Sequence, residues 1–275
     1  MNKESFEKIF GVKKPIIGMV HLDPLPGAPK YNAELSIKGI VGRALQDASI
    51  LVEGGVDGIM VENQWDRPWL KAEDIGFETV AVMSSVIQKI RDEYTIPMGV
   101  NVHLNGVCQA IAIALATGCQ FIRAFELANA YVSSSGIIEA AGPKAVRYRN
   151  HLKAEDKISI FADFHVKHGS HQIIADKSLK EQAEDIEEAL GDAIIVTGLK
   201  TGNPPERKDL ELLKQIVDIP IIIGSGLSVD NMKDLLPLAD GAIVGSYFKK
   251  DSKIANPIDV DRVKNFTQTA RQFRM

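Results

Sequence analysis

The sequence predicts an α/β protein folded as a (β/α)8 barrel, the TIM barrel, and two observations lead to this fold class. Eight short runs rich in β-branched residues recur along the chain, and segments with helical periodicity separate most of them. Alternating strands and helices predict parallel strands joined by crossover helices. Eight such units within about 235 residues match the size of this barrel, which takes about 250 residues.

The predicted strands are short and are bounded by turn-forming residues. They cover residues 15–22, 57–63, 97–104, 121–126, 158–168, 193–198, 220–226 and 241–248. An open doubly wound sheet is the main alternative, and its first strand usually leads into a G-x-G-x-x-G turn. Here the first strand leads into HLDPLPG instead, which favours the barrel.

Apolar residues at three- and four-residue spacing predict helices between the strands. They cover residues 36–55, 76–94, 105–118, 179–191, 206–218 and 228–240, and a C-terminal helix covers about 257–273. No linker or charge block divides the chain. We therefore expect one TIM-barrel domain over residues 1–275, with barrel strands from about 15 to 248.

Bulk composition argues against several classes of partner. The net charge is −4, so there is no basic footprint for nucleic acid. No apolar run approaches the roughly 18 residues that span a bilayer, and the N-terminus lacks the apolar core of a signal peptide. We expect a soluble cytoplasmic protein with no integral membrane segment, whose Cys108 and Cys119 stay reduced.

Polar residues concentrate at the carboxyl ends of the predicted strands, where TIM barrels carry their chemistry. Because alternate side chains of a strand share a face, FADFHVKH should direct Asp163, His165 and Lys167 inward and Phe164 and Val166 toward the helices. The same alternation gives a set of candidate catalytic residues. They are His21, Glu62, Asn101, His103, Arg123, Asp163, His165 and Lys167. The alternative for some of them is a buried ion pair, for example Arg123 with Asp163 or Glu62.

The last two predicted strands end in turns that contain glycine, Gly224-Ser225-Gly226 and Gly245-Ser246. Such turns let backbone N–H groups approach an anion, and many barrels hold a substrate phosphate after strands seven and eight. Lys200 and Thr201 belong to the same predicted phosphate site. They lie in the loop GLKTGNPPERKD, which is also a candidate lid. The alternative is that small residues merely permit tight turns.

Seven motifs occur in the order GMVHLDPLPGAP, DGIMVEN, GVNVHLNG, FIRAFE, FADFHVKH, VTGLKTG and IGSGLSVDN. From about Pro15 to about Lys250, the chain resembles the BtpA/SgcQ family. The resemblance implies a barrel of the ribulose-phosphate-binding type. It also implies a link to photosystem I biogenesis for cyanobacterial members, and sugar-phosphate enzymes or nucleosidases for SgcQ-like members. It implies no defined reaction.

These observations favour an enzyme that acts on a phosphorylated sugar or a nucleoside-derived substrate. Asp163 is the candidate general base or oxocarbenium stabiliser, and His165 or His103 the candidate proton donor. Lys167 is a candidate for Schiff-base formation. Epimerisation, aldol cleavage and N-glycosidic hydrolysis all stay open. The expected partners are a small phosphorylated metabolite and further copies of the chain.

Two other hypotheses belong to different classes. No cofactor is expected, but a metal-dependent hydrolase is a minority alternative, with a divalent ion on His21, His103, Asp163 and His165. The other is a non-catalytic assembly factor or metabolite sensor. Inward charge argues against a purely structural role, since buried charge without a purpose is expensive.

Overall fold

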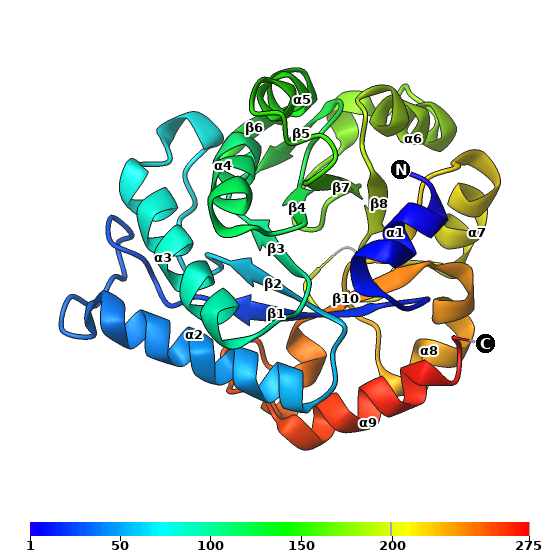
Figure 1. Cartoon of the computed structure of the whole chain (residues 1–275). Coiled ribbons are helices and arrows are strands. Elements are labelled where there is room, and N and C mark those ends of the chain that lie inside the picture. Colours follow the sequence, from blue (N-terminus) through cyan, green and yellow to red (C-terminus); the bar gives the residue numbers. More distant parts are fainter. Residues whose placement is uncertain (199, 275) are drawn as a thin grey trace.

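The computed structural model describes residues 1–198 and 200–274, in which eight parallel strands close into a barrel (Figure 1). In chain order they are β1 (Ile16–His21), β2 (Gly58–Glu62), β3 (Met98–Asn101), β4 (Phe121–Ala124), β7 (Ser159–Phe164), β8 (Ala193–Val196), β9 (Ile221–Ile223) and β10 (Gly241–Val244). Strand β1 pairs with both β2 and β10, which closes the barrel. The predicted fold class, a (β/α)8 barrel, is confirmed.

Helices surround the barrel on its outer face (Figure 1). They are α2 (Ser36–Glu53), α3 (Phe77–Glu93), α4 (Val107–Thr117), α5 (Gly142–His151), α6 (Leu179–Glu188), α7 (Arg207–Ile216), α8 (Val229–Leu235) and α9 (Val260–Arg271). Helix α9 packs beside α2, so the end of the chain lies against its first crossover helix. The sequence predicts all of these helices except α5.

Strand alternation separates two apolar layers. Val20, Val61 and Val100 belong to the large cluster between strands and helices. Met19, Met60 and further inward side chains form a second cluster inside the barrel. The polar residues that end the inward rows, such as His21 after Met19, therefore reach the carboxyl-terminal mouth of the barrel.

Helix α1 (Lys3–Phe10) closes the opposite end of the barrel, and the sequence reading missed it. Its Phe6 and Phe10 are buried in the interior cluster, with ring centroids 5.7 Å from Phe161 and 5.5 Å from Phe121, respectively. Asn2 caps this helix by accepting a hydrogen bond from the Ser5 N–H. These aromatic rings close one end of the barrel. The opposite end, where the polar residues at the carboxyl ends of the strands lie, is the mouth.

A β-hairpin at the mouth is a second element that the sequence reading missed. Strands β5 (Ala130–Ser133) and β6 (Gly136–Glu139) pair antiparallel and lie between β4 and α5 in the chain. Tyr131 and Ile138 of this hairpin pack in a small cluster with Leu104, Phe125 and Val166, among others. The hairpin thereby adds an apolar wall beside the polar strand ends.

Two further observations concern the predicted class of the protein. Within residues 1–198 and 200–274, none of the helices has the length and apolar character needed to cross a membrane. Cys108 and Cys119 are both free thiols, and burial raises the pKa of Cys119 to about 11.

Candidate functional site

A cavity at the mouth of the barrel brings together residues from both predicted groups. It is open to solvent and is called the mouth cavity below. The predicted catalytic residues in its lining are His21, Glu62, Arg123 and Lys167. The predicted phosphate-binding residues in its lining are Thr201, Gly224, Ser225, Gly226, Gly245 and Ser246. The sequence predicts these two sets of residues by separate arguments, and in the structure both sets line the same cavity.

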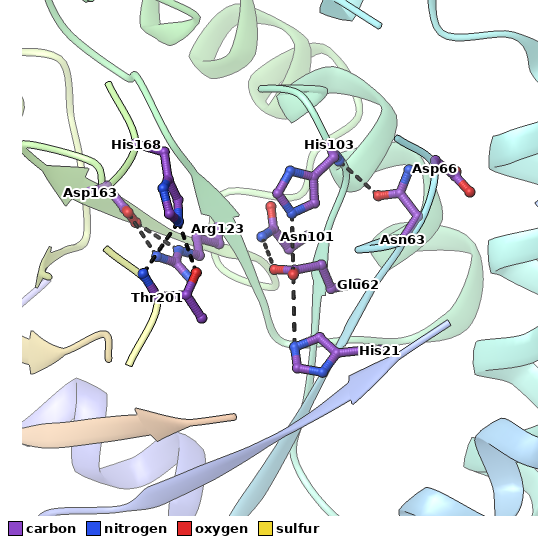
Figure 2. A network of polar contacts seen from close by, with 10 residues as sticks. All are labelled: His21, Glu62, Asn63, Asp66, Asn101, His103, Arg123, Asp163, His168 and Thr201. Carbon is purple, nitrogen blue, oxygen red and sulfur yellow. Dashed lines mark hydrogen bonds and ion pairs between the residues drawn. The ribbon is translucent and has the colours of Figure 1, made fainter. Parts of the chain in front are cut away.

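Glu62 is the centre of a polar cluster that follows directly from strand register. His21, Glu62 and Asn101 are Cα partners on the adjacent strands β1, β2 and β3. Asn101 Nδ2 donates to Glu62 Oε2 at 2.5 Å. His103 Nε2 lies 3.2 Å and His21 Nε2 3.9 Å from Glu62 Oε1. Figure 2 shows the carboxylate of Glu62 between the two imidazole rings.

The electrostatics of this cluster fix a negative charge on Glu62. Burial by itself would raise the pKa of Glu62, but His103, His21 and Arg123 outweigh it and hold the pKa well below its usual range. Burial is also the main effect on His21 and lowers its pKa to about 4. At neutral pH the cavity therefore presents an ionised Glu62 next to a neutral His21.

Arg123 and Asp163 form a buried ion pair, the alternative that the sequence left open. Arg123 Nε and Nη2 each donate to one Asp163 oxygen at 2.7 Å, which is the bidentate geometry of a strong pair (Figure 2). The two side chains are 2% and 0% exposed. Arg123 reaches the mouth cavity, whereas Asp163 is not part of its lining.

Lys167 lies just beyond β7 and lines the mouth cavity. Burial, followed by the positive charge of Arg123, lowers the pKa of Lys167 to about 8. Glu62 and Asp163 oppose this shift without cancelling it. Near neutral pH a fraction of Lys167 is therefore an uncharged amine, which is the form that acts as a nucleophile or a base.

The prediction that His165 faces the mouth is wrong. Strand β7 ends at Phe164, and His165 has a φ of +52°, in the left-handed region where strand alternation no longer holds. Its ring stacks on Phe164 with a centroid distance of 4.6 Å, and its Nε2 lies 2.5 Å from Gln182 Oε1 of α6. His165 therefore contacts the helix layer.

The same break in alternation moves the residues that follow. Val166, predicted to pack on the helices, instead belongs to the small apolar cluster beside the hairpin. His168 lies 2.9 Å from the Thr201 hydroxyl through its Nε2 and accepts a hydrogen bond from the Thr201 N–H (Figure 2). The loops after β7 and β8 are thereby joined above the mouth.

The turns after β9 and β10 present main-chain donors. Among the residues that the structure describes, the N–H groups of Gly226, Gly245 and Ser246 donate to no protein acceptor. Packing also explains part of the glycine pattern: Gly226 has a φ of +71°, and a Cβ there would lie 2.1 Å from Pro204 N. Gly245 has no such collision, since the nearest atom to an added Cβ is His21 Cε1 at 3.3 Å.

Only one of the two residues predicted to bind phosphate in the loop after β8 reaches the cavity. Thr201 lines the mouth cavity, whereas Lys200 is exposed and is not among the lining residues. Leu199 of the predicted lid lies outside the described residues. The role of this loop as a lid stays a prediction.

Nearly the whole chain is similar to known proteins. The family model that matches residues 12–272 is described as the BtpA family. The chain belongs to the BtpA family. A protein of Methanocaldococcus jannaschii is 38% identical over 263 residues, which cover 96% of this chain and 97% of the relative. The Photosystem I biogenesis protein BtpA of Synechocystis is 36% identical over 261 residues, which cover 94% and 88%.

Solved structures with the same fold include barrels from Pyrococcus furiosus. N-(5'-phosphoribosyl)anthranilate isomerase matches with a TM-score of 0.56 at 16% identity, over 94% of this BtpA-family chain and 99% of the isomerase. Thiamine phosphate pyrophosphorylase matches with a TM-score of 0.55 at 12% identity, over 94% and 96%. At such identities the likeness shows the fold alone.

The four residues of the metal alternative are not gathered in this BtpA-family barrel. Asp163 is paired with Arg123, and His165 contacts α6. His21 and His103 share Glu62 as a partner. Over the described part of the chain, no group of three or more His, Cys, Asp and Glu side chains is arranged to hold a metal ion.

Sequence reasoning missed the side chains that hold the mouth loops of the BtpA-family protein in place. Asn63 Oδ1 accepts from the His103 N–H at 2.8 Å, and its Nδ2 donates to Asp66 Oδ2 at 2.8 Å (Figure 2). Asp66 Oδ1 in turn accepts from the Leu25 N–H at 2.7 Å. The loops after β1, β2 and β3 are thereby tied together. The run of polar residues in ENQWD was the available signal.

Proposed function

We propose that this BtpA-family protein is an enzyme that acts on a small phosphorylated sugar or a nucleoside-derived phosphate in the mouth cavity. One observation carries the proposal: the glycine-containing turns after β9 and β10 line the same cavity as Glu62 and Lys167. A phosphate on the turns would hold the rest of a small substrate against Glu62 and Lys167, and such positioning is a large part of catalysis.

The phosphate-binding role belongs to the turns after β9 and β10. The N–H groups of Gly226, Gly245 and Ser246 are donors without a protein partner among the described residues, as a phosphate site requires. Thr201 adds a hydroxyl, and Lys167 in its protonated form adds a positive charge. These groups together favour a phosphate over an uncharged ligand.

The reactive role belongs to Glu62 and Lys167. We transfer to Glu62 the function first predicted for Asp163, because both Asp163 oxygens accept hydrogen bonds from Arg123. An ionised Glu62 can remove a proton or stabilise a cationic carbon. Lys167, with a pKa of about 8, can transfer a proton or form an imine. Epimerisation, aldol cleavage and N-glycosidic hydrolysis all use such groups.

The proposal is tested by ligand binding and then by turnover. Thermal shift and calorimetry with inorganic phosphate and ribose 5-phosphate should show binding to the wild-type protein. Ser246→Asp should weaken that binding about tenfold or more, because it sets a carboxylate against the phosphate. Ser49→Asp adds the same charge on the exposed face of α2 and should leave binding unchanged. Absence of phosphate binding in the wild-type protein would overturn the proposal.

The name of the Synechocystis relative favours a second candidate, a metabolite-binding assembly factor without turnover. The cavity would then bind a phosphorylated metabolite as a signal. NMR spectra of sugar phosphates incubated with the protein separate the two candidates. New product signals that vanish in Glu62→Gln support the enzyme, whereas tight binding with unchanged ligand spectra supports the sensor.

A further inference from the structure

A second cavity adjoins the mouth cavity and has a different chemical character. We call it the aromatic cavity, because Trp69, His103, Phe125 and Tyr131 line it, with Leu104 and Val166. The two cavities share three lining residues: Gln64, Lys167 and Thr201. A ligand that passes these three residues would therefore lie partly in each cavity.

We infer that the aromatic cavity holds a planar ring attached to the phosphorylated part of the substrate, and that this ring is neutral or anionic. The inference rests on the proposed function, since the phosphate sets which end of the ligand reaches the aromatic cavity. Of the two substrate classes in the proposed function, it selects the nucleoside-derived phosphates, which carry a planar ring on the sugar phosphate.

The walls of the aromatic cavity are held in place by stacking. Trp69 stacks on His103 with ring centroids 4.4 Å apart and an interplanar angle of 11°. His103 in turn contacts Phe125 at 4.8 Å, and the guanidinium of Arg67 lies 4.6 Å from the Trp69 ring centroid. A fixed apolar slot loses little side-chain freedom when a ring enters, which favours binding of flat groups.

The charged side chains that line the aromatic cavity determine which charge a bound ring can carry. Arg67 and Lys167 line the aromatic cavity, and the described part of the chain contributes no Asp or Glu to it. Trp69 already contacts the Arg67 cation. A cationic ring would meet two positive side chains without a carboxylate to offset them, so it should bind worse than a neutral ring of similar size.

The hairpin β5–β6 supplies a position that blocks the aromatic cavity without disturbing its core. Ser134, at the turn of the hairpin, is exposed and lines this cavity. Ser134→Trp should fill the cavity from its rim. Val132 on β5 is 42% exposed and lines neither cavity, so Val132→Trp is the matched control.

The test compares dissociation constants measured by calorimetry on the full chain. Uridine or adenosine 5'-monophosphate should bind about tenfold or more tightly than ribose 5-phosphate, the gain expected from stacking one ring. Nicotinamide mononucleotide, whose ring is cationic, should lack this gain. Ser134→Trp should remove the gain and leave ribose 5-phosphate binding unchanged, while Val132→Trp should keep both.

The outcomes separate the inference from the proposed function. If ribose 5-phosphate binds and neither neutral-ring nucleotide binds more tightly, the inference is wrong and the proposed function stands. If the cationic ring gives the largest gain, or if Ser134→Trp keeps the gain, the inference is likewise wrong. If neither inorganic phosphate nor ribose 5-phosphate binds, the proposed function itself fails.

Discussion

The mouth cavity has a charged side, formed by His21, Glu62, Arg123 and Lys167, and a main-chain side, formed by the turns Gly224–Gly226 and Gly245–Ser246. On the charged side most groups already have protein partners. Glu62 contacts Asn101 and two histidines, and Arg123 is paired with Asp163. On the main-chain side, the described structure leaves four N–H groups without an acceptor, those of Ser225, Gly226, Gly245 and Ser246.

The main-chain side is therefore suited to attract a ligand, and the charged side is prepared for chemistry. Unpaired N–H groups gain hydrogen bonds when an anion arrives, whereas paired charges gain little. Paired charges instead fix the orientation and protonation of the side chains before a ligand is present, as electrostatic catalysis requires. Substitutions on the charged side should therefore affect stability and turnover, and those on the main-chain side should affect binding.

The largest effect is expected where the charged side is most buried. Asp163→Asn leaves the Arg123 guanidinium without its carboxylate at a site where both side chains are almost fully buried. Breaking one partner of such a pair costs about 3–5 kcal/mol in the free energy of unfolding, measured by urea denaturation. The double variant Arg123→Met, Asp163→Leu should recover much of the loss. A loss below about 1 kcal/mol for Asp163→Asn would contradict the pairing.

A change in turnover, with binding preserved, is expected for Glu62→Gln. The amide keeps the size of the side chain and removes its negative charge, so general base or cation stabilisation is lost. The turnover rate should fall about a hundredfold or more, while the dissociation constant of inorganic phosphate changes little. If the affinity for phosphate fell as steeply as turnover, Glu62 would contribute to phosphate binding. The division between a charged side for chemistry and a main-chain side for binding would then be wrong.

The smallest expected effect is the pH dependence of phosphate binding, which tests whether Lys167 of the charged side also contacts the phosphate. Lys167 is protonated below its pKa of about 8 and neutral above it, so affinity should fall as pH rises through this value. The ligand for this test is a phosphate monoester such as ribose 5-phosphate, whose second pKa is about 6, so its charge stays nearly constant between about pH 7 and pH 9.5. Calorimetry across this range should show the decrease, and Lys167→Met should bind weakly at every pH. A pH-independent affinity would remove Lys167 from the phosphate site.

The same shift predicts a stability change with the opposite sign. The folded-state pKa of Lys167 is lowered from the usual lysine value of 10.5, so the folded protein binds this proton less readily than the unfolded chain. The resulting penalty is present below about pH 8 and is relieved as pH rises toward the unfolded value. Wild-type and Lys167→Met proteins should therefore differ in the pH slope of their unfolding free energy over this range.

How far the sequence predicts this molecule depends on the regularity of each segment. All eight barrel strands are predictable from β-branched runs, and Met19, His21, Met60 and Glu62 follow strand alternation to the interior and the mouth. Alternation fails after Phe164, because His165 adopts a positive φ that no residue type in FADFHVKH demands. Such a backbone choice is set by tertiary contacts, here the contact with Gln182.

Two missed elements show a different limit. The hairpin β5–β6 and helix α5 lie in the connection between β4 and β7, where the sequence alternates neither as a long strand nor as an amphipathic helix. The turn residues SSSG between short apolar pairs were the available signal for the hairpin. Because the hairpin supplies Tyr131 and Ser134 to the aromatic cavity, missing it hid one wall of that cavity.

The packing of helix α1 has a consequence for how the chain is expected to fold. Phe6 and Phe10 dock among interior side chains of β4, β7 and β10, and an added Cβ on Gly241 of β10 would lie 3.2 Å from the Phe6 ring. The chamber that receives these rings exists only once β10 has paired with β1. We therefore expect α1 to dock after these strands have paired, so that burial of Phe6 and Phe10 would report that the barrel has closed.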